Sequence, residues 1–95
     1  MTPKSNNEGP FLLGVDAGTE SLRAGIFDLH GNPLAFSSTA YKTKFPKPGW
    51  AEQNPLDWWE ALGISVKNAI SEAGISSSAV AAMCLDTTCC SVVAL

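Results

Sequence analysis

Residues 14–28, GVDAGTESLRAGIFD, contain a short polar segment between two apolar ones. It overlaps the apolar run FLLGVD of residues 11–16, and it ends in LRAGIFD, residues 22–28, which is rich in aliphatic and aromatic residues. Apolar runs of this length, bounded by turn residues, are typical of buried β-strands. The intervening AGTES therefore predicts a short loop between two neighbouring antiparallel strands.

The residues after this hairpin predict a third strand, a helix and a fourth strand. A turn in LHGNP, residues 29–33, leads into LAFSSTAYKTKF, residues 34–45, whose aromatic and threonine content favours an antiparallel strand. Asn54 as N-cap, Pro55 in the first helical position and Gly74 as the stop delimit a helix. VAAMCLD, residues 80–86, indicates a buried strand. The apolar stripe of the helix comprises Leu56, Trp59, Leu62, Val66, Ile70 and Ala73.

Composition limits the classes of protein to which this hairpin can belong. The chain has 95 residues, enough for one small domain, and its net charge of -3 gives no electrostatic footprint for nucleic acid or an anionic membrane. No apolar segment is long enough to span a bilayer. Three cysteines, two of them adjacent at Cys89 and Cys90, suit neither a disulfide framework nor a zinc site. We expect a cytoplasmic protein with reduced thiols.

The two ends of the chain predict its domain organisation. Residues 1–10 are polar and contain two prolines, which indicates a tail. SVVAL, residues 91–95, is strand-like and stops without a turn or a cap. We therefore expect residues 11–95 to be the incomplete N-terminal part of a longer protein's first domain.

The loop of the hairpin has the residues of a phosphate site. Gly18 permits positive φ and close backbone approach, and successive amides from Thr19 to Ser21 can form a nest for an anion. The hydroxyls of Thr19 and Ser21 and the guanidinium of Arg23 add donors. Asp16 would repel a phosphate unless a cation such as Mg²⁺ lay between them. The same residues also suit a polar turn without a ligand.

The order of the residues in this motif is similar to that of a known superfamily. DAGTESLRAGIFD, residues 16–28, resembles the first phosphate motif of the actin-like and sugar-kinase ATPase superfamily. Together with WAEQNPLDWWEAL, residues 50–62, and LDTTCCSVVAL, residues 85–95, it makes the chain similar to the N-terminus of an FGGY-family carbohydrate kinase. The resemblance implies an α/β, RNase H-like (actin/hexokinase-type ATPase) fold, of which this chain has the N-terminal β-β-β-α-β portion.

The resemblance also implies an activity, which is transfer of the ATP γ-phosphoryl group to a sugar hydroxyl with Mg²⁺ as cofactor. Asp16 would face the metal, and Gly18, Thr19, Ser21 and Arg23 would lie at the ATP phosphates. Relatives often have a hydroxyl where this chain has Glu20. The base aspartate is expected beyond residue 95, so no catalytic residue lies within the chain and the fragment alone should be inactive.

The segment after the fourth strand lines the sugar pocket in this family. Glycerol kinases typically have an Arg-Glu pair and xylulokinases a Met-His pair where this sequence has two cysteines. The pattern here is most similar to the ribulokinase-like branch, which implies a ketopentose such as ribulose as substrate. The substrate residues implied are Asp86, Thr87, Thr88, Cys89 and Cys90.

Other interpretations stay open. A non-catalytic nucleotide- or phosphate-binding module of actin-like fold fits the same hairpin, and so does a structural domain with no ligand. Trp58 and Trp59 suit packing, and the adjacent cysteines suit small buried hydrophobic residues. A homodimer of the full-length protein is also left open.

Overall fold

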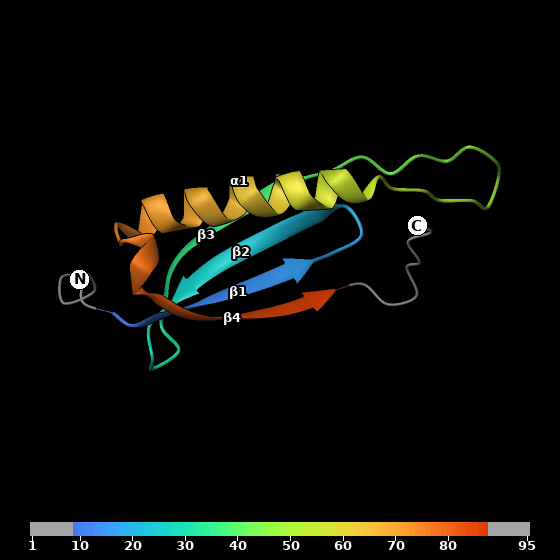
Figure 1. The fold of residues 1–95 in the computed structure, drawn as a ribbon. Coiled ribbons are helices and arrows are strands. Elements are labelled where there is room, and N and C mark those ends of the chain that lie inside the picture. Colours follow the sequence, from blue (N-terminus) through green and yellow to red (C-terminus); the bar gives the residue numbers. More distant parts are fainter. Residues whose placement is uncertain (1–8, 88–95) are drawn as a thin grey trace.

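Residues 9–87 of this computed structural model form a four-stranded sheet with one long helix, α1, against one face (Figure 1). The β-β-β-α-β order predicted from the sequence is confirmed. The predicted strand over residues 91–95 lies outside the described residues. The elements are β1 (Phe11–Ala17), β2 (Ser21–Phe27), β3 (Pro33–Ala40), α1 (Pro55–Ala73), the short 3-10 turn η2 (Ser77–Ala79) and β4 (Val80–Thr87).

The strand order β3-β2-β1-β4 places β1 between an antiparallel and a parallel neighbour. A parallel partner requires a crossover, and α1 provides it. The carboxyl ends of β1 and β4 therefore lie at the same edge of the sheet as the turn between β1 and β2 (Figure 1). The pairing of β1 with β4 shifts by one residue beside Phe11, where Ala81 is the extra residue of β4.

The core lies between α1 and the face of the sheet that it covers. Alternate residues of β1 and β2 point toward α1, as the period of two in a strand requires. The helix contacts this face through small residues, and Ser65 among them is fully buried, with its hydroxyl 2.6 Å from the Thr39 hydroxyl. The buried apolar residues of this core are Phe11, Leu13, Val15, Leu22, Ala24, Ile26, Ala61 and Ala69.

The helix begins and ends where the sequence predicts. Asn54 adopts an extended conformation, and its side chain accepts a hydrogen bond from the Leu56 amide. Gly74 closes the helix in the left-handed conformation at φ 71°. The predicted apolar stripe is wrong at its N-terminal end, because Leu56 and Trp59 are 73% and 74% exposed.

Two strand predictions also need correction. The third strand was expected to reach residue 45, but β3 ends at Ala40 and the chain leaves the sheet there. The fourth strand was expected to be buried, yet Met83 and Leu85 of β4 are more than half exposed. The reason is that α1 packs on β2 and β3, while β4 forms the outer strand of the described sheet. Within residues 9–87, no helix is long and apolar enough to span a membrane.

Candidate functional site

Three charged side chains lie side by side on β2, β1 and β4, near the carboxyl end of β1. Asp16 pairs with Arg23 in the register of β1 with β2, and with Asp86 in the register of β1 with β4. Arg23 Nη2 donates to Asp16 Oδ2 at 2.8 Å, and the two side chains are 65% and 42% exposed. All three project from the face opposite α1, because residues 13 and 15 of β1 point toward the helix.

The carboxyl groups of Asp16 and Asp86 share a hydrogen bond. That bond lowers the pKa of Asp16, and the bond from Arg23 lowers it further. The same contact raises the pKa of Asp86, because its neutral form is the donor and because the negative charge of Asp16 opposes its ionisation. Two carboxylates this close repel each other when both are ionised, and a cation bound between them would relieve that repulsion.

The turn that joins β1 to β2 is tight. The Gly18 amide donates to the Ser21 carbonyl at 2.9 Å, and a Cβ on Gly18 would lie 3.3 Å from that oxygen. An alanine at this position would therefore require the Ser21 carbonyl to move by a few tenths of an ångström. Gly18 does not use the positive φ that glycine permits. Thr19 and Glu20 form the exposed tip of the turn.

Residues beyond β3 hold this turn, and sequence reasoning missed their role. The hydroxyl of Tyr41 donates to the carbonyls of Gly18 and Ser21, the latter at 3.2 Å. The Tyr41 amide donates to the Glu20 carbonyl at 3.1 Å. Burial of the phenol raises the pKa of Tyr41, so that it remains a donor. No local pattern marks such a residue; only the early end of β3 explains its position.

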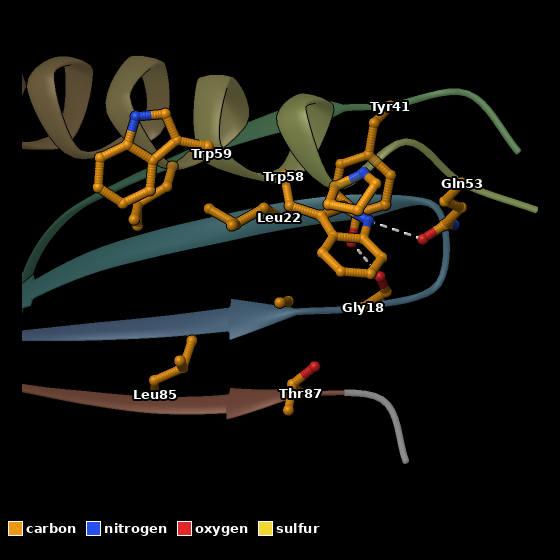
Figure 2. A pocket seen from close by; sticks show the side chains of 11 residues that line it. Gly18, Leu22, Tyr41, Gln53, Trp58, Trp59, Leu85 and Thr87 are labelled. Carbon is orange, nitrogen blue, oxygen red and sulfur yellow. Dashed lines mark hydrogen bonds between the residues drawn. The ribbon is translucent and has the colours of Figure 1, made fainter. Parts of the chain in front are cut away.

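Five of the predicted site residues line two separate hollows. Asp16, Arg23 and Asp86 line one of about 540 Å³ on the face opposite α1. Gly18 and Thr87 line another, of about 400 Å³, between the sheet and the first turns of α1 (Figure 2).

Two adjacent candidate substrate residues thus face opposite ways, because successive side chains of a strand alternate. Asp86 joins the charged group and Thr87 joins the hollow under α1. Thr88, Cys89 and Cys90 lie outside the described residues.

The paired carboxylates of Asp16 and Asp86 fit Mg²⁺. This ion prefers hard oxygen ligands, and it commonly uses one or two carboxylates together with phosphate oxygens and water. Two carboxylates leave most positions of an octahedral ion open to phosphate oxygens and water, and within residues 9–87 no group of three or more metal-binding side chains occurs. The donor set therefore suits a metal that arrives with a phosphate ligand.

Comparison with known proteins adds the family. Residues 11–95 match the N-terminal domain of the FGGY family of carbohydrate kinases. The glycerol kinase of Thermococcus onnurineus is 40% identical over 73 residues, which are 77% of this chain and 15% of that protein. The glycerol kinase of Limosilactobacillus reuteri is 35% identical over 77 residues, which are 81% of this chain and 15% of that protein.

Solved structures agree on the fold. The xylulose kinase of Rhodospirillum rubrum superposes with a TM-score of 0.73 at 26% identity, over 83% of this chain and 16% of that one. The Plasmodium falciparum glycerol kinase with ADP gives a TM-score of 0.66 at 24% identity, over 82% of this chain and 15% of that one.

The chain spans about 15% of the length of the curated relatives it matches. The α/β, actin/hexokinase-type fold inferred from the first hairpin is confirmed. Because the match to the N-terminal domain covers nearly all of the chain, residues 11–95 belong to the FGGY family of carbohydrate kinases.

Proposed function

We propose that the protein carrying this chain transfers the γ-phosphoryl group of ATP to a hydroxyl of a sugar, with a ketopentose such as ribulose as substrate. Residues 11–95 are then the first part of the kinase's N-terminal domain, after a tail of residues 1–10. The observation that carries the proposal is the position of Asp16. It lies between Arg23 and Asp86, at the sheet edge where the phosphate-type turn begins.

Each residue of this group has a role in binding. Asp16 and Asp86 would hold the magnesium ion that accompanies ATP, through their carboxylate oxygens. When bound, that ion neutralises phosphate charge. Arg23 has a second guanidinium edge for a phosphate oxygen while it contacts Asp16, because guanidinium has five donors. Thr19 and Ser21 add hydroxyl donors at the turn.

The reaction needs little covalent chemistry from the protein. A sugar hydroxyl oxygen forms a bond to the γ-phosphorus, the bond from that phosphorus to the β–γ bridging oxygen breaks, and the hydroxyl proton passes to a carboxylate. By the family resemblance, this carboxylate belongs to an aspartate beyond residue 95. The present residues therefore contribute positioning and charge neutralisation.

The choice of sugar rests on the segment that begins at Asp86. Its Asp-Thr-Thr-Cys order is similar to that of ribulokinase-like proteins. Similar proteins include glycerol and xylulose kinases, so glycerol and xylulose are the necessary competitors in any test.

The test uses protein expressed from the complete reading frame that carries these residues. ADP release with Mg²⁺ and ATP is measured for ribulose, xylulose and glycerol, with Asp16→Asn as the inactive variant. Glu60→Gln, an exposed change on α1, is the control that should retain full rate. A preference for glycerol would refute the ketopentose assignment. Tight ATP binding with no turnover on any acceptor would favour the non-catalytic module.

A further inference from the structure

Each carbonyl group of the turn between β1 and β2 accepts a hydrogen bond from the segment that follows β3. Tyr41 donates hydrogen bonds to the carbonyls of Gly18, Glu20 and Ser21. The side chain of Gln53, just before α1, donates through Nε2 to the remaining one, the Thr19 carbonyl. Four consecutive carbonyls, residues 18–21, thus accept hydrogen bonds from Tyr41 and Gln53, and the Thr43 hydroxyl adds a longer bond of 3.5 Å to the Thr19 carbonyl.

Trp58 fixes which end of the Gln53 amide faces the turn. The indole Nε1 is a donor only, and it donates to Gln53 Oε1 at 2.8 Å (Figure 2). The amide nitrogen must then face the opposite way, toward the Thr19 carbonyl and the Thr43 hydroxyl at 2.7 Å. A Gln53 amide turned by half a rotation would place oxygen against oxygen at the turn and nitrogen against nitrogen at the indole.

A carbonyl held on one side determines where the next amide points. The peptide unit is planar and trans, so its C=O and N–H groups point in opposite directions. Holding the carbonyls of Gly18 and Thr19 on the side of Tyr41 and Gln53 therefore directs the amides of Thr19 and Glu20 away from it. Among residues 9–87, no acceptor is hydrogen-bonded to these two amides.

We propose that Trp58 and Gln53 form a relay that positions the turn for phosphate, with Tyr41 as a second support. This inference rests on the proposed function, because it assigns the exposed amides of Thr19 and Glu20 to the phosphates of ATP. None of the three side chains needs to touch the nucleotide. Their effect is to prevent the turn from presenting carbonyl oxygens, which repel phosphate, in place of amides, which bind it.

The test again uses protein from the complete reading frame. Gln53→Glu keeps the acceptor for the indole and removes the donor for Thr19, so it breaks the relay with minimal change in shape. Asn68→Asp, at an exposed position of α1, adds the same charge away from the turn and is the matched control. Dissociation constants for Mg-ATP and for Mg-tripolyphosphate are measured by calorimetry, together with the KM for sugar and the melting temperature.

We expect Gln53→Glu to weaken binding of both phosphate ligands by about tenfold or more, the equivalent of one lost hydrogen bond to a charged group. The KM for sugar and the melting temperature should remain close to those of the Asn68→Asp control. Trp58→Phe should weaken binding less, and the double variant no more than Gln53→Glu alone, because both changes interrupt the same relay.

Two negative results are distinguishable. If the wild-type protein binds ATP and Gln53→Glu binds it within about twofold of the control, the relay is refuted while the proposed function stands. If the wild type binds neither phosphate ligand, the proposed function itself fails and the relay fails with it. Should Gln53→Glu fold poorly, Trp58→Phe and Thr43→Val give the same comparison, and unchanged phosphate binding in both would overturn the inference.

Discussion

Asp16 in β1 and Asp86 in β4 are paired residues of two parallel strands, and their carboxyl groups share a hydrogen bond. This relationship changes the role that the sequence suggested for Asp86. The resemblance placed it among the sugar-binding residues, whereas its pairing places it beside the proposed metal ligand. Asp86 can therefore contact either the sugar or the metal ion, and substitution of this residue distinguishes the two roles.

Asp86→Asn should raise the Mg²⁺ concentration needed for half-maximal turnover by about tenfold, because one of two charged oxygen donors is replaced by an amide. The measurement is a Mg²⁺ titration of ADP release at saturating sugar. Glu60→Gln is the control for loss of one exposed negative charge. An increase confined to the KM for sugar would instead assign Asp86 to the substrate.

Arg23→Met should weaken ATP binding by about tenfold while it changes the free energy of unfolding by less than about 1 kcal/mol. The reason for the small stability effect is that both partners of the Arg23–Asp16 ion pair are well exposed to water. Lys67→Met removes one exposed positive charge from α1 and provides the comparison. Calorimetry and chemical denaturation measure the two quantities. Equal ATP affinity in the two variants would contradict a phosphate role for Arg23.

The Asp28 carboxylate should stabilise the fold in a way that depends on pH. Its carboxylate accepts hydrogen bonds from the His30 amide at 2.8 Å and from the amide and side chain of Asn32 at 2.9 and 3.0 Å. The side-chain bond from Asn32 is the main reason that the pKa of Asp28 lies below its ordinary value of 3.8. A lowered pKa in the folded state stabilises the fold above the ordinary value and loses that effect as the pH falls through the lowered one.

The melting temperature of Asp28→Ala should therefore lie below that of the wild type near pH 7, and the difference should shrink as the pH falls below 3.8. Thermal melts across this range measure it. A difference that stays constant with pH would show that the carboxylate charge is not responsible.

Gly25→Ala should destabilise the fold by about 1 kcal/mol. A Cβ on this buried residue would lie 2.6 Å from the Phe36 ring, which packs edge-on against Phe27 with centroids 5.6 Å apart. The Phe36 ring is more than half exposed, so it can swing aside at the expense of that contact.

Gly63→Ala is the matched control, because nothing lies within 4 Å of the added methyl in α1. Alanine in a helix interior should stabilise by about 0.5–1 kcal/mol. Denaturation curves of both variants compare the signs, and a stabilised Gly25→Ala would show that the ring contact is unimportant.

How far the sequence predicts this fold depends on how local the signals are. The boundaries of α1 were predicted because Asn54 and Gly74 act on their own immediate neighbours. The end of β3 was not predicted, because it depends on a distant contact. The Tyr41 hydroxyl donates to carbonyls of a turn about twenty residues earlier in the chain. The exposure of Trp59 was not predicted for a related reason. Apolar periodicity predicts one face of α1, but it does not predict which strands that face covers.

In the candidate site, too, local features were predicted from the sequence and distant contacts were not. Asp16, Gly18 and Arg23 were identified from one short motif, and the structure places them around one turn and its flanking strands. The pairing of Asp16 with Asp86 depends on the register across a crossover, and the contact of Gln53 with Thr19 depends on the path of residues 41–54. Neither has a counterpart in sequence spacing.

The extra residue at Ala81 has a consequence for how this segment tolerates insertions and deletions. It shifts β4 by one position, and without that shift Leu85 would stand opposite Asp16 in place of Asp86. Substitutions along the exposed part of β4 should therefore be accepted far more readily than a change in its length. Removing a single small residue, remote from every charged group, would exchange a carboxylate for an aliphatic side chain at the centre of the site.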